Sequence, residues 1–356
     1  MHSHANRLAA SSWCGVFYVT GGGISFLADI LTTPGASKTL LDASIPYSTS
    51  ALEDLLHVSV DQAVATETAR SLGMAAYQRA KQLNSPQPFG FGVTATLTTD
   101  REKKGATRAH WAIQTQSDTW AFELELDTAE SREAQEQTLN EACWQSINAV
   151  LLQSAPLPSG ANHQQADANW QQLLAHSPHT WCNKTHAGQL LLPGAFNPQH
   201  AGHRGMLETA ETITGLPGAY ELCVRNVDKP NLDYLTMAER VSAISDRPVW
   251  LTNLGSFVDK AEAFPKATFA VGIDTLQRVA EARFYRDSAA EMALAFRHMG
   301  ELGIRFLVFG RRQGNRFVTC DDLTLPDALR RLCEPVSEDQ YRSDLSSTAL
   351  RKARKP

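Results

Sequence analysis

The segment that most constrains the fold of this chain is Gly194–His203, which reads GAFNPQHAGH. It follows the apolar run Gln189–Leu192 and precedes a helical pattern, the position at which an open α/β sheet places its ligand crevice. His200 and His203 stand three residues apart, so one helical turn directs both imidazoles to the same side. Gly202 leaves room for a nucleotide against the backbone, and N–H groups at a helix start favour phosphate. The segment predicts a phosphate site; the alternative is a helix that simply begins with these residues.

Strand and helix patterns alternate through the rest of the second half, which predicts a mostly parallel, doubly wound, Rossmann-like sheet with helices on both faces. The apolar runs expected as strands are Gln189–Leu192, Glu221–Val224, Val249–Leu251, Thr268–Ile273 and Ile304–Phe309. Helical patterns include Met237–Ile244 and a pair between Thr275 and Met299.

The first half predicts a separate α/β domain, because 356 residues exceed the usual size of one core. A strand at Val16–Val19 runs through a glycine turn into a helix at Ile24–Leu31. Further expected elements are helices at Asp61–Leu83 and Ser131–Gln153 and strands at Phe91–Leu97, Arg108–Gln114 and Trp120–Leu126. Residues 154–169 contain two prolines and almost no large apolar side chain. We therefore expect domains at 1–153 and 188–356, joined by a linker and short helix at 154–187.

Charge and cysteine usage exclude several classes of protein. The formal net charge of −5 argues against a nucleic-acid binder that depends on phosphate neutralisation. No apolar run approaches the length of a membrane span, so no membrane partner is expected. The six cysteines are scattered, without spacing for a zinc site, so we expect reduced thiols, no protein-held metal and a cytoplasmic location.

Two motifs of the second half resemble the H-x-G-H nucleotidyltransferase superfamily, and within it the nicotinamide or nicotinate mononucleotide adenylyltransferases. Gly194–His203 matches their leading G-x-F-[DN]-P-x-H-x-G-H, and Leu345–Arg351 (LSSTALR) matches their [IV]-S-[ST]-T-x-[IL]-R. Ser346, Ser347 and Thr348 are also good helix N-cap residues, with Arg351 one turn further on, so the segment can hold a polyphosphate. The alternative is a capped helix with a solvated arginine.

The resemblance implies transfer of AMP from magnesium-bound ATP to a pyridine mononucleotide, with release of pyrophosphate. It assigns His200, His203 and Arg351 to catalysis and implies Mg²⁺ as a cofactor that arrives with ATP. The residues that it assigns to nucleotide binding are Gly194, Ala195, Phe196, Gly202, Lys229, Gly272, Asp274, Arg311, Ser346, Ser347 and Thr348. A surface lysine at 229 and a helix-capping Asp274 are competing explanations. Other open readings are a different phosphorylated acceptor such as phosphopantetheine, the use of CTP, and an idle nucleotide-binding or assembly module.

The first half, from about Val16 to Leu152, resembles the C-terminal domain of the CinA family, the nicotinamide-nucleotide amidohydrolases. The resemblance rests on Thr20, Gly21, Gly22, Gly23, Pro34–Ser37 and Ile45–Ser48, and it places Ser37 and Tyr47 at a deamidating site. The relatives have a lysine five positions beyond this tyrosine, where this chain has Leu52. Their later T-G-x-A-G-P segment is replaced by Val93–Asp100. An unactivated serine is a weak nucleophile, so we expect a degenerate domain that binds a nucleotide or stabilises a homo-oligomer. The alternative for the glycines is a tight turn without a ligand.

Overall fold

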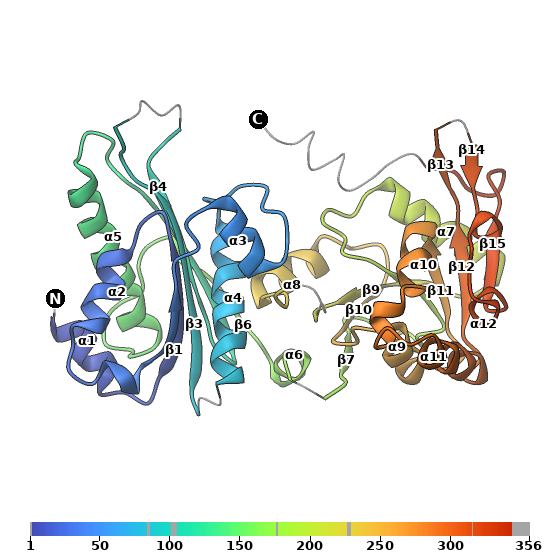
Figure 1. Cartoon of the computed structure of the whole chain (residues 1–356), viewed down its shortest axis with the longest axis horizontal. Helices are drawn as coiled ribbons and strands as arrows, with labels where there is room; N and C mark the ends of the chain where they lie inside the picture. The colour runs from blue at the N-terminus through green and yellow to red at the C-terminus, as the bar shows by residue number, and fades with distance from the viewer. Residues whose placement is uncertain are drawn as a thin grey trace. The chain divides into compact units, whose positions relative to one another are not determined.

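The computed structural model describes residues 2–83, 86–100, 105–175, 177–225, 229–314 and 316–343. The chain divides into two compact units (Figure 1). Unit 1 comprises Met1–Leu174 and Asn226–Ala238, and unit 2 comprises Ala175–Arg225 and Glu239–Pro356. Unit 1 therefore includes a segment that the chain reaches only after it has entered unit 2. Helix α8 (Tyr234–Ser242) begins in that segment and ends in unit 2.

Unit 1 is built on a mixed six-stranded sheet of order β2-β1-β3-β4-β5-β6. Its strands are β1 (Cys14–Thr20), β2 (Leu40–Ser44), β3 (Pro88–Thr96), β4 (Arg108–Gln114), β5 (Asp118–Glu125) and β6 (Asn162–Gln165). β1 pairs in parallel with β2 and β3, whereas β3 to β6 pair in antiparallel succession. The carboxyl ends of β1 and β2 therefore meet at one edge of the sheet.

Helices cover both faces of this sheet, as Figure 1 shows. One face carries α1 (His2–Ala9), α2 (Ile24–Leu31) and α5 (Arg132–Val150), and the other carries α3 (Thr49–Leu56) and α4 (Thr66–Gln82). Alternation along β1 supplies both cores, because Phe17 packs with the first group and Val16 with the second. A 3₁₀ turn, η1 (Ala36–Lys38), precedes β2, and α6 (Ala168–Leu173) follows β6.

Helix α4 lies unusually close to the sheet because glycines face each other there. A Cβ atom on Gly90 or Gly92 of β3 would stand 2.1 Å from Gly73 O or 2.3 Å from Gly73 N, respectively. Gly73, the lone glycine in the expected helix at Asp61–Leu83, thus allows backbone to pack against backbone.

The returning segment is anchored in unit 1 by buried polar contacts. Tyr234 is wholly buried, its hydroxyl donates to Gln116 O at 2.6 Å, and its backbone N–H donates to Thr119 Oγ1 at 3.0 Å. Burial raises the pKa of the Tyr234 hydroxyl. Asp233 and Arg70, both about 95% buried, pair at 3.8 Å. The segment is therefore an integral part of the core of unit 1.

Unit 2 contains a seven-stranded, mostly parallel sheet of order β15-β12-β11-β8-β9-β10-β7. The strands are β7 (Thr180–Cys182), β8 (Leu190–Pro193), β9 (Ala219–Cys223), β10 (Val249–Thr252), β11 (Thr268–Gly272), β12 (Arg305–Phe309) and β15 (Cys333–Val336). Among the described strands of this sheet, only β7, at the edge, pairs antiparallel. Counted from β8, the parallel strands follow the doubly wound order 3-2-1-4-5-6. A separate hairpin, β13 (Arg311–Gln313) and β14 (Arg316–Val318), follows β12.

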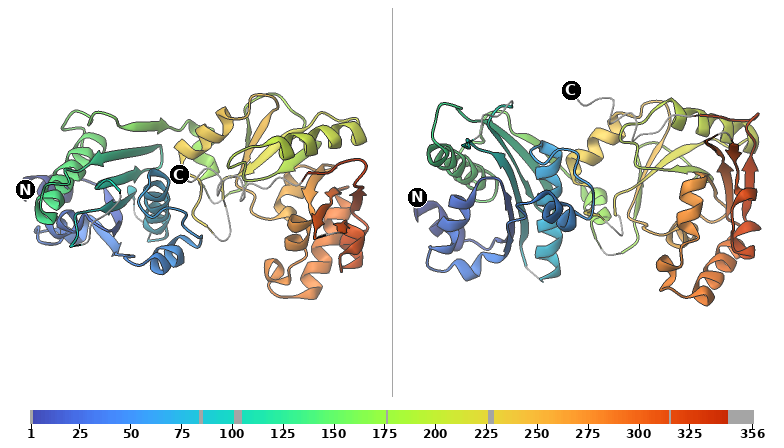
Figure 2. Two further views of the ribbon diagram at one scale, coloured as in Figure 1. Left: turned by 90° about the horizontal axis from the view of Figure 1, so that it is seen from above. Right: turned by 45° about the horizontal axis from the view of Figure 1, so that its top comes forward.

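The helices of unit 2 lie on both faces of its sheet (Figure 2). One face packs against α9 (Phe257–Ala263), α10 (Ile273–Val279), α11 (Ala289–Glu301) and α12 (Asp327–Arg330), and α7 (Ala201–Thr214) contacts β8 and β11 from the other.

A pair of oppositely charged side chains lies inside unit 2. Glu221 is wholly buried and Lys260 is 5% exposed; the two form an ion pair, and Thr252 Oγ1 donates to the same carboxylate.

The prediction of two α/β parts is confirmed, with differences at their junction. The helix at Ile24–Leu31 and the strand at Arg108–Gln114 match α2 and β4 residue for residue. The expected linker is not a linker throughout, because β6 pairs with β5 in the first sheet and β7 pairs with β10 in the second. β6 is an edge strand with mostly exposed side chains, so it lacks an apolar signal. None of the described helices is long and apolar enough to cross a membrane.

Candidate functional site

The candidate site of unit 2 lies where the strand order reverses, between β8 and β11. These two strands pair at only two positions, Thr268 with Leu190 and Phe269 with Leu191. Each then continues towards its carboxyl end without that pairing, to Pro193 in β8 and to Gly272 in β11. Open α/β sheets bind ligands outside the carboxyl ends of their strands at this reversal. The predicted segment Gly194–His203 directly follows β8, and the predicted residues Gly272 and Asp274 lie at the end of β11 and in the first turn of the helix after it.

The loop after β8 has a fixed conformation. Gly194 N donates to Glu221 O at 3.0 Å, and Arg240 Nη1 of α8 donates to Ala195 O at 3.0 Å. Phe196 adopts a left-handed φ of 47° and is 3% exposed. Its ring packs edge-on against His203, with ring centres 5.1 Å apart. The apolar residue of the motif thus holds the second histidine in place.

The two histidines stand together at the start of α7, as the three-residue spacing predicts. Their ring centres are 3.7 Å apart with planes inclined by 24°. His200 N donates to His203 Nδ1 at 3.3 Å, so the ring proton of neutral His203 is on Nε2. Burial, and secondly the neighbouring His200, lower the pKa of His203 to about 4. Burial and Arg204 lower the pKa of His200. His203 is therefore an uncharged Nε2–H donor at neutral pH.

Gly202 lies against the end of the described chain. Tyr341 Oη donates to Gly202 O at 2.6 Å, and the Tyr341 ring packs edge-on against Phe309 at the end of β12. A Cβ atom at position 202 would stand 3.0 Å from Ser343 Oγ and from the His200 ring. The chain therefore packs closely against this glycine, and a larger residue would have to push these two side chains aside. The segment that leads to the serine-rich motif runs directly past the H-x-G-H turn.

Asp274 and Arg311 are brought together by the fold. Asp274 lies in the first turn of α10 after β11, Arg311 lies in β13 after β12, and the two side chains form an ion pair. Both remain about half exposed. Gly272, which precedes α10, has open space where a Cβ atom would lie. The three residues share the carboxyl edge of neighbouring strands β11 and β12.

Five other predicted residues are not placed at this edge. Ser346, Ser347, Thr348 and Arg351 lie outside the described residues. Lys229 is exposed and belongs to the returning segment of unit 1 rather than to unit 2. Its surface position matches the competing explanation given for it.

The glycine turn of unit 1 is held by side chains from the start of α5. A Cβ atom on Gly21, which has a φ of 77°, would stand 1.9 Å from Ala95 O, so the turn needs glycine. Glu136 accepts from Gly23 N at 2.9 Å and from Ser25 N at 2.8 Å. Arg132 donates to Gly21 O at 3.2 Å. The turn thus uses two of its amides on a carboxylate of the same chain.

Ser37 and Tyr47 are not brought together. Ser37 lies in η1 at the amino ends of the parallel strands, where Cys14 Sγ donates to Lys38 O at 3.1 Å. Tyr47 follows the carboxyl end of β2, and Thr20 Oγ1 donates at 2.9 Å to the carbonyl just before it. The five residues of β2 separate the two by about 13 Å or more. Thr20, Gly21, Gly22 and Tyr47 share one edge of the sheet, whereas Ser37 lies at the other.

The position at which the relatives have a lysine supplies no cation in this chain. Leu52 is 1% exposed and packs in the core beneath α3. Three other lysines are candidates to replace the missing cation: Lys38 is exposed in η1, and Lys103 and Lys104 lie outside the described residues. The arrangement provides no activating cation between Ser37 and Tyr47 among the described residues.

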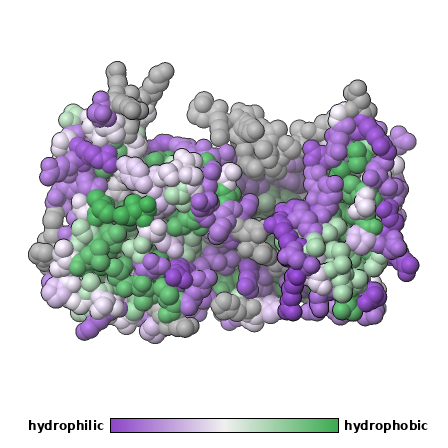
Figure 3. Space-filling model, viewed as in Figure 1, coloured by the Kyte–Doolittle hydropathy of each residue, from purple (hydrophilic) through white to green (hydrophobic). Residues whose placement is uncertain are grey.

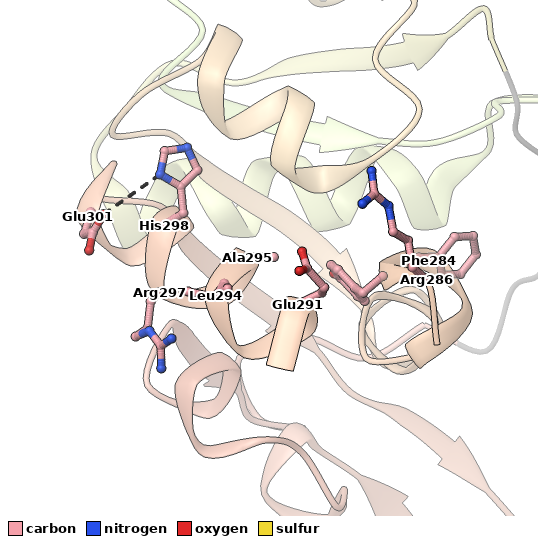
Figure 4. Close-up of a pocket in the computed structure, with 9 residues that line it drawn as sticks. Phe284, Arg286, Glu291, Leu294, Ala295, Arg297, His298 and Glu301 are labelled. Carbon is pink, nitrogen blue, oxygen red and sulfur yellow. Dashed lines mark ion pairs between the residues drawn. The ribbon is translucent and has the colours of Figure 1, made fainter. Parts of the chain in front are cut away.

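Each unit has a hollow on its described surface. The one in unit 1, of about 490 Å³, is lined by Gly21, Gly22 and Tyr47 among others. The one in unit 2, of about 480 Å³, lies along η2 (Ala282–Tyr285) and α11, where His298 pairs with Glu301 at 3.9 Å (Figure 4). Its lining includes none of the residues predicted from the motifs. Among the described residues, no group of three or more His, Cys, Asp or Glu side chains could hold a metal ion.

Sequence reasoning missed several residues that shape these sites. Arg240 was expected only as part of a helix, and Tyr341, Arg132 and Glu136 were not singled out. All four form hydrogen bonds with backbone groups more than 40 residues away in the chain. Their only sequence signals are ordinary side chains within helices or a polar tail.

No family model matches the chain, and no curated protein matches it. Solved structures of CinA-type proteins are similar to part of it. A competence/damage-inducible protein of Agrobacterium tumefaciens is 16% identical over 42% of this chain and 93% of its own, with a TM-score of 0.37. The competence damage-inducible protein A of Klebsiella pneumoniae is 13% identical over 42% of this chain and 96% of its own, also at 0.37. A CinA superfamily protein of Escherichia coli is 14% identical over 39% and 81%, at 0.32. Each of these similarities extends over about 40% of the chain.

Proposed function

We propose that unit 2 transfers AMP from ATP to nicotinamide or nicotinate mononucleotide and releases pyrophosphate. The observation that carries the proposal is His203, which is held as a neutral Nε2–H donor beside His200 at the start of α7, next to the strand reversal. A helix start of this kind favours phosphate, and a fixed donor stabilises charge that builds up during transfer.

The proposed reaction needs positioning more than acid–base chemistry. A phosphate oxygen of the mononucleotide attacks the α-phosphorus of ATP, a new P–O bond forms, and the bond to the β-phosphate oxygen breaks. The electron pair of the broken bond leaves with pyrophosphate. The attacking oxygen is already ionised, so no general base is required. Magnesium bound to the triphosphate would offset part of its negative charge.

Residues at the carboxyl edge of the sheet fit separate tasks in this reaction. His200 and His203 would contact the triphosphate, and the loop Gly194–Phe196, fixed by Arg240, would lie under the nucleotide. Arg311 would leave Asp274 for a phosphate when the nucleotide binds. Tyr341 contacts Gly202, so the described chain ends beside this turn, three residues before Ser346. This proximity supports the assignment of Ser346, Ser347, Thr348 and Arg351 to the departing pyrophosphate.

The test is a pyrophosphate-release assay with magnesium, ATP and nicotinamide mononucleotide. His203→Ala should slow release by about 30- to 1000-fold, corresponding to the 2–4 kcal/mol that one oriented donor contributes to a transition state. His203→Gln keeps a donor and should lose less. His298→Ala on exposed α11 is the matched control and should leave the rate unchanged.

Release that persists undiminished in His203→Ala would refute the catalytic assignment. An acceptor panel that includes phosphopantetheine, and CTP in place of ATP, tests the choice of substrates. Calorimetric binding of ATP without pyrophosphate release across that panel would instead favour an idle nucleotide-binding module.

A further inference from the structure

The glycine turn of unit 1 already holds an anion, and that anion is Glu136. Both of its oxygens are engaged, Oε2 by Gly23 N at 2.9 Å and Oε1 by Ser25 N at 2.8 Å. These amides flank Ile24, the first residue of the eight-residue helix α2, where a bound phosphate would otherwise lie. A phosphorylated ligand would therefore have to displace a carboxylate that is fixed to α5.

A hollow of about 490 Å³ adjoins this turn and has apolar walls. Val19, Ile24, Ile45 and Tyr47 line it, and Ile24, Ile45 and Tyr47 are 48%, 49% and 69% exposed. Exposed apolar side chains are normal when they are scattered singly, but here three of them line one hollow, and grouped apolar surface marks a binding site. The space-filling view shows apolar surface over α2 in this unit (Figure 3).

The charged side chains around the hollow determine whether it favours a positively or a negatively charged ligand. Its charged lining residues are Arg132, Glu133 and Glu136, which together carry a net charge of −1. The Arg132 guanidinium is engaged by the carbonyls of Gly21 and Thr98. Glu136 is held by the two amides, and Glu133 is exposed. The rim therefore attracts a cation and repels an anion.

We propose that this hollow binds an organic monocation with an apolar body, such as a substituted ammonium ion, and does not bind phosphate. The apolar body packs against Ile24 and Ile45, and the positive charge lies between the exposed ring of Tyr47 and the carboxylate of Glu133. Aromatic faces attract ammonium groups in this way. The proposal concerns unit 1 and is independent of the function proposed for unit 2.

The first test titrates the full chain with three probes of similar size: benzyltrimethylammonium, benzyl alcohol and phenyl phosphate. We expect saturable binding of the cation in isothermal calorimetry, with at least about tenfold weaker binding of the other two. Tyr47→Ala and Glu133→Gln should each weaken the cation by about two- to fivefold, the range of one exposed cation–π or ionic contact. Glu141→Gln, an exposed glutamate on the same helix, is the matched control and should change nothing.

The second test removes the internal anion. Glu136→Ala frees Gly23 N and Ser25 N and removes one negative charge from the hollow, so phenyl phosphate should gain measurable affinity while the ammonium probe binds more weakly. Circular dichroism checks that the variant is folded, and Glu136→Gln, which keeps one amide acceptor, provides the milder change. The proposal is overturned if wild-type protein binds phenyl phosphate better than the cation, if no probe binds, or if Glu141→Gln weakens the cation as much as Glu133→Gln.

Discussion

The buried pair Glu221–Lys260 offers a test of the core of unit 2 by the substitution Lys260→Met. Methionine keeps most of the volume of lysine but removes the ammonium group. The Glu221 carboxylate, which is wholly buried, would then retain only the Thr252 hydroxyl as a side-chain partner among the residues that the structure describes. Breaking a buried pair on one side costs about 3–5 kcal/mol, because the remaining charge is uncompensated. Since whole domains are stable by only about 5–15 kcal/mol, this loss should be plain in urea unfolding followed by circular dichroism.

Two further variants test whether the loss of stability comes from an unpaired buried charge. Lys260→Met combined with Glu221→Gln removes both charges, and the double variant should be more stable than Lys260→Met alone. Arg283→Met breaks an exposed pair with Glu281 and should cost at most about 1 kcal/mol. If Lys260→Met is no more destabilising than Arg283→Met, the two charges are not buried together as described.

Three other expectations follow from the site of unit 2. Tyr341→Phe removes the donor to Gly202 O and should lower the free energy of unfolding by about 0.5–1.5 kcal/mol in urea titrations, and an unchanged value would mean that the contact is absent in solution. Because the pKa of His203 is lowered to about 4, the unfolded chain binds a proton below pH 6.5 that the folded chain refuses until about pH 4. The free energy of unfolding should therefore decrease as the pH falls through this window, by at most about 3 kcal/mol before solvent screening is considered. Urea titrations at pH 7 and pH 5 measure this decrease, which should be smaller for His203→Gln than for the wild-type protein. Arg311→Met breaks an exposed pair with Asp274, so it should change the unfolding free energy by less than about 1 kcal/mol while weakening ATP binding in calorimetry; equal ATP affinity would remove Arg311 from the proposed site.

Strongly patterned elements of the fold could be predicted from the sequence, and weakly patterned ones could not. The helix Ile24–Leu31 and the strand Arg108–Gln114 have apolar residues at the period of their structure, and both were predicted to the residue. β2 (LLDAS) is partly buried along its whole length and shows no clear alternation, so it was missed. β6 was assigned to a linker because an edge strand of polar residues looks like one.

For the candidate site, sequence reasoning located the local motif but not its distant supports. Gly194–His203 lies at the strand reversal as expected, because a contiguous motif on a strand-to-helix turn carries its own geometry. The roles of Arg240 and Tyr341 depend on which elements the fold brings beside that motif, and no periodic pattern encodes such contacts. The glycine turn of unit 1 was open to two readings, and the contacts of Glu136 now account for two of its amides without a ligand.

The return of residues 226–238 to unit 1 has a consequence for anyone who wishes to cut the protein in two. A fragment that stops at Leu174 would lack Asp233 and Tyr234, and it would leave Arg70 without its buried carboxylate. A fragment that starts at Ala175 would carry the same tyrosine with its hydroxyl and ring deprived of their burial site. No single scission can release both halves intact, so two fragments cut at this boundary and produced separately should aggregate rather than remain soluble.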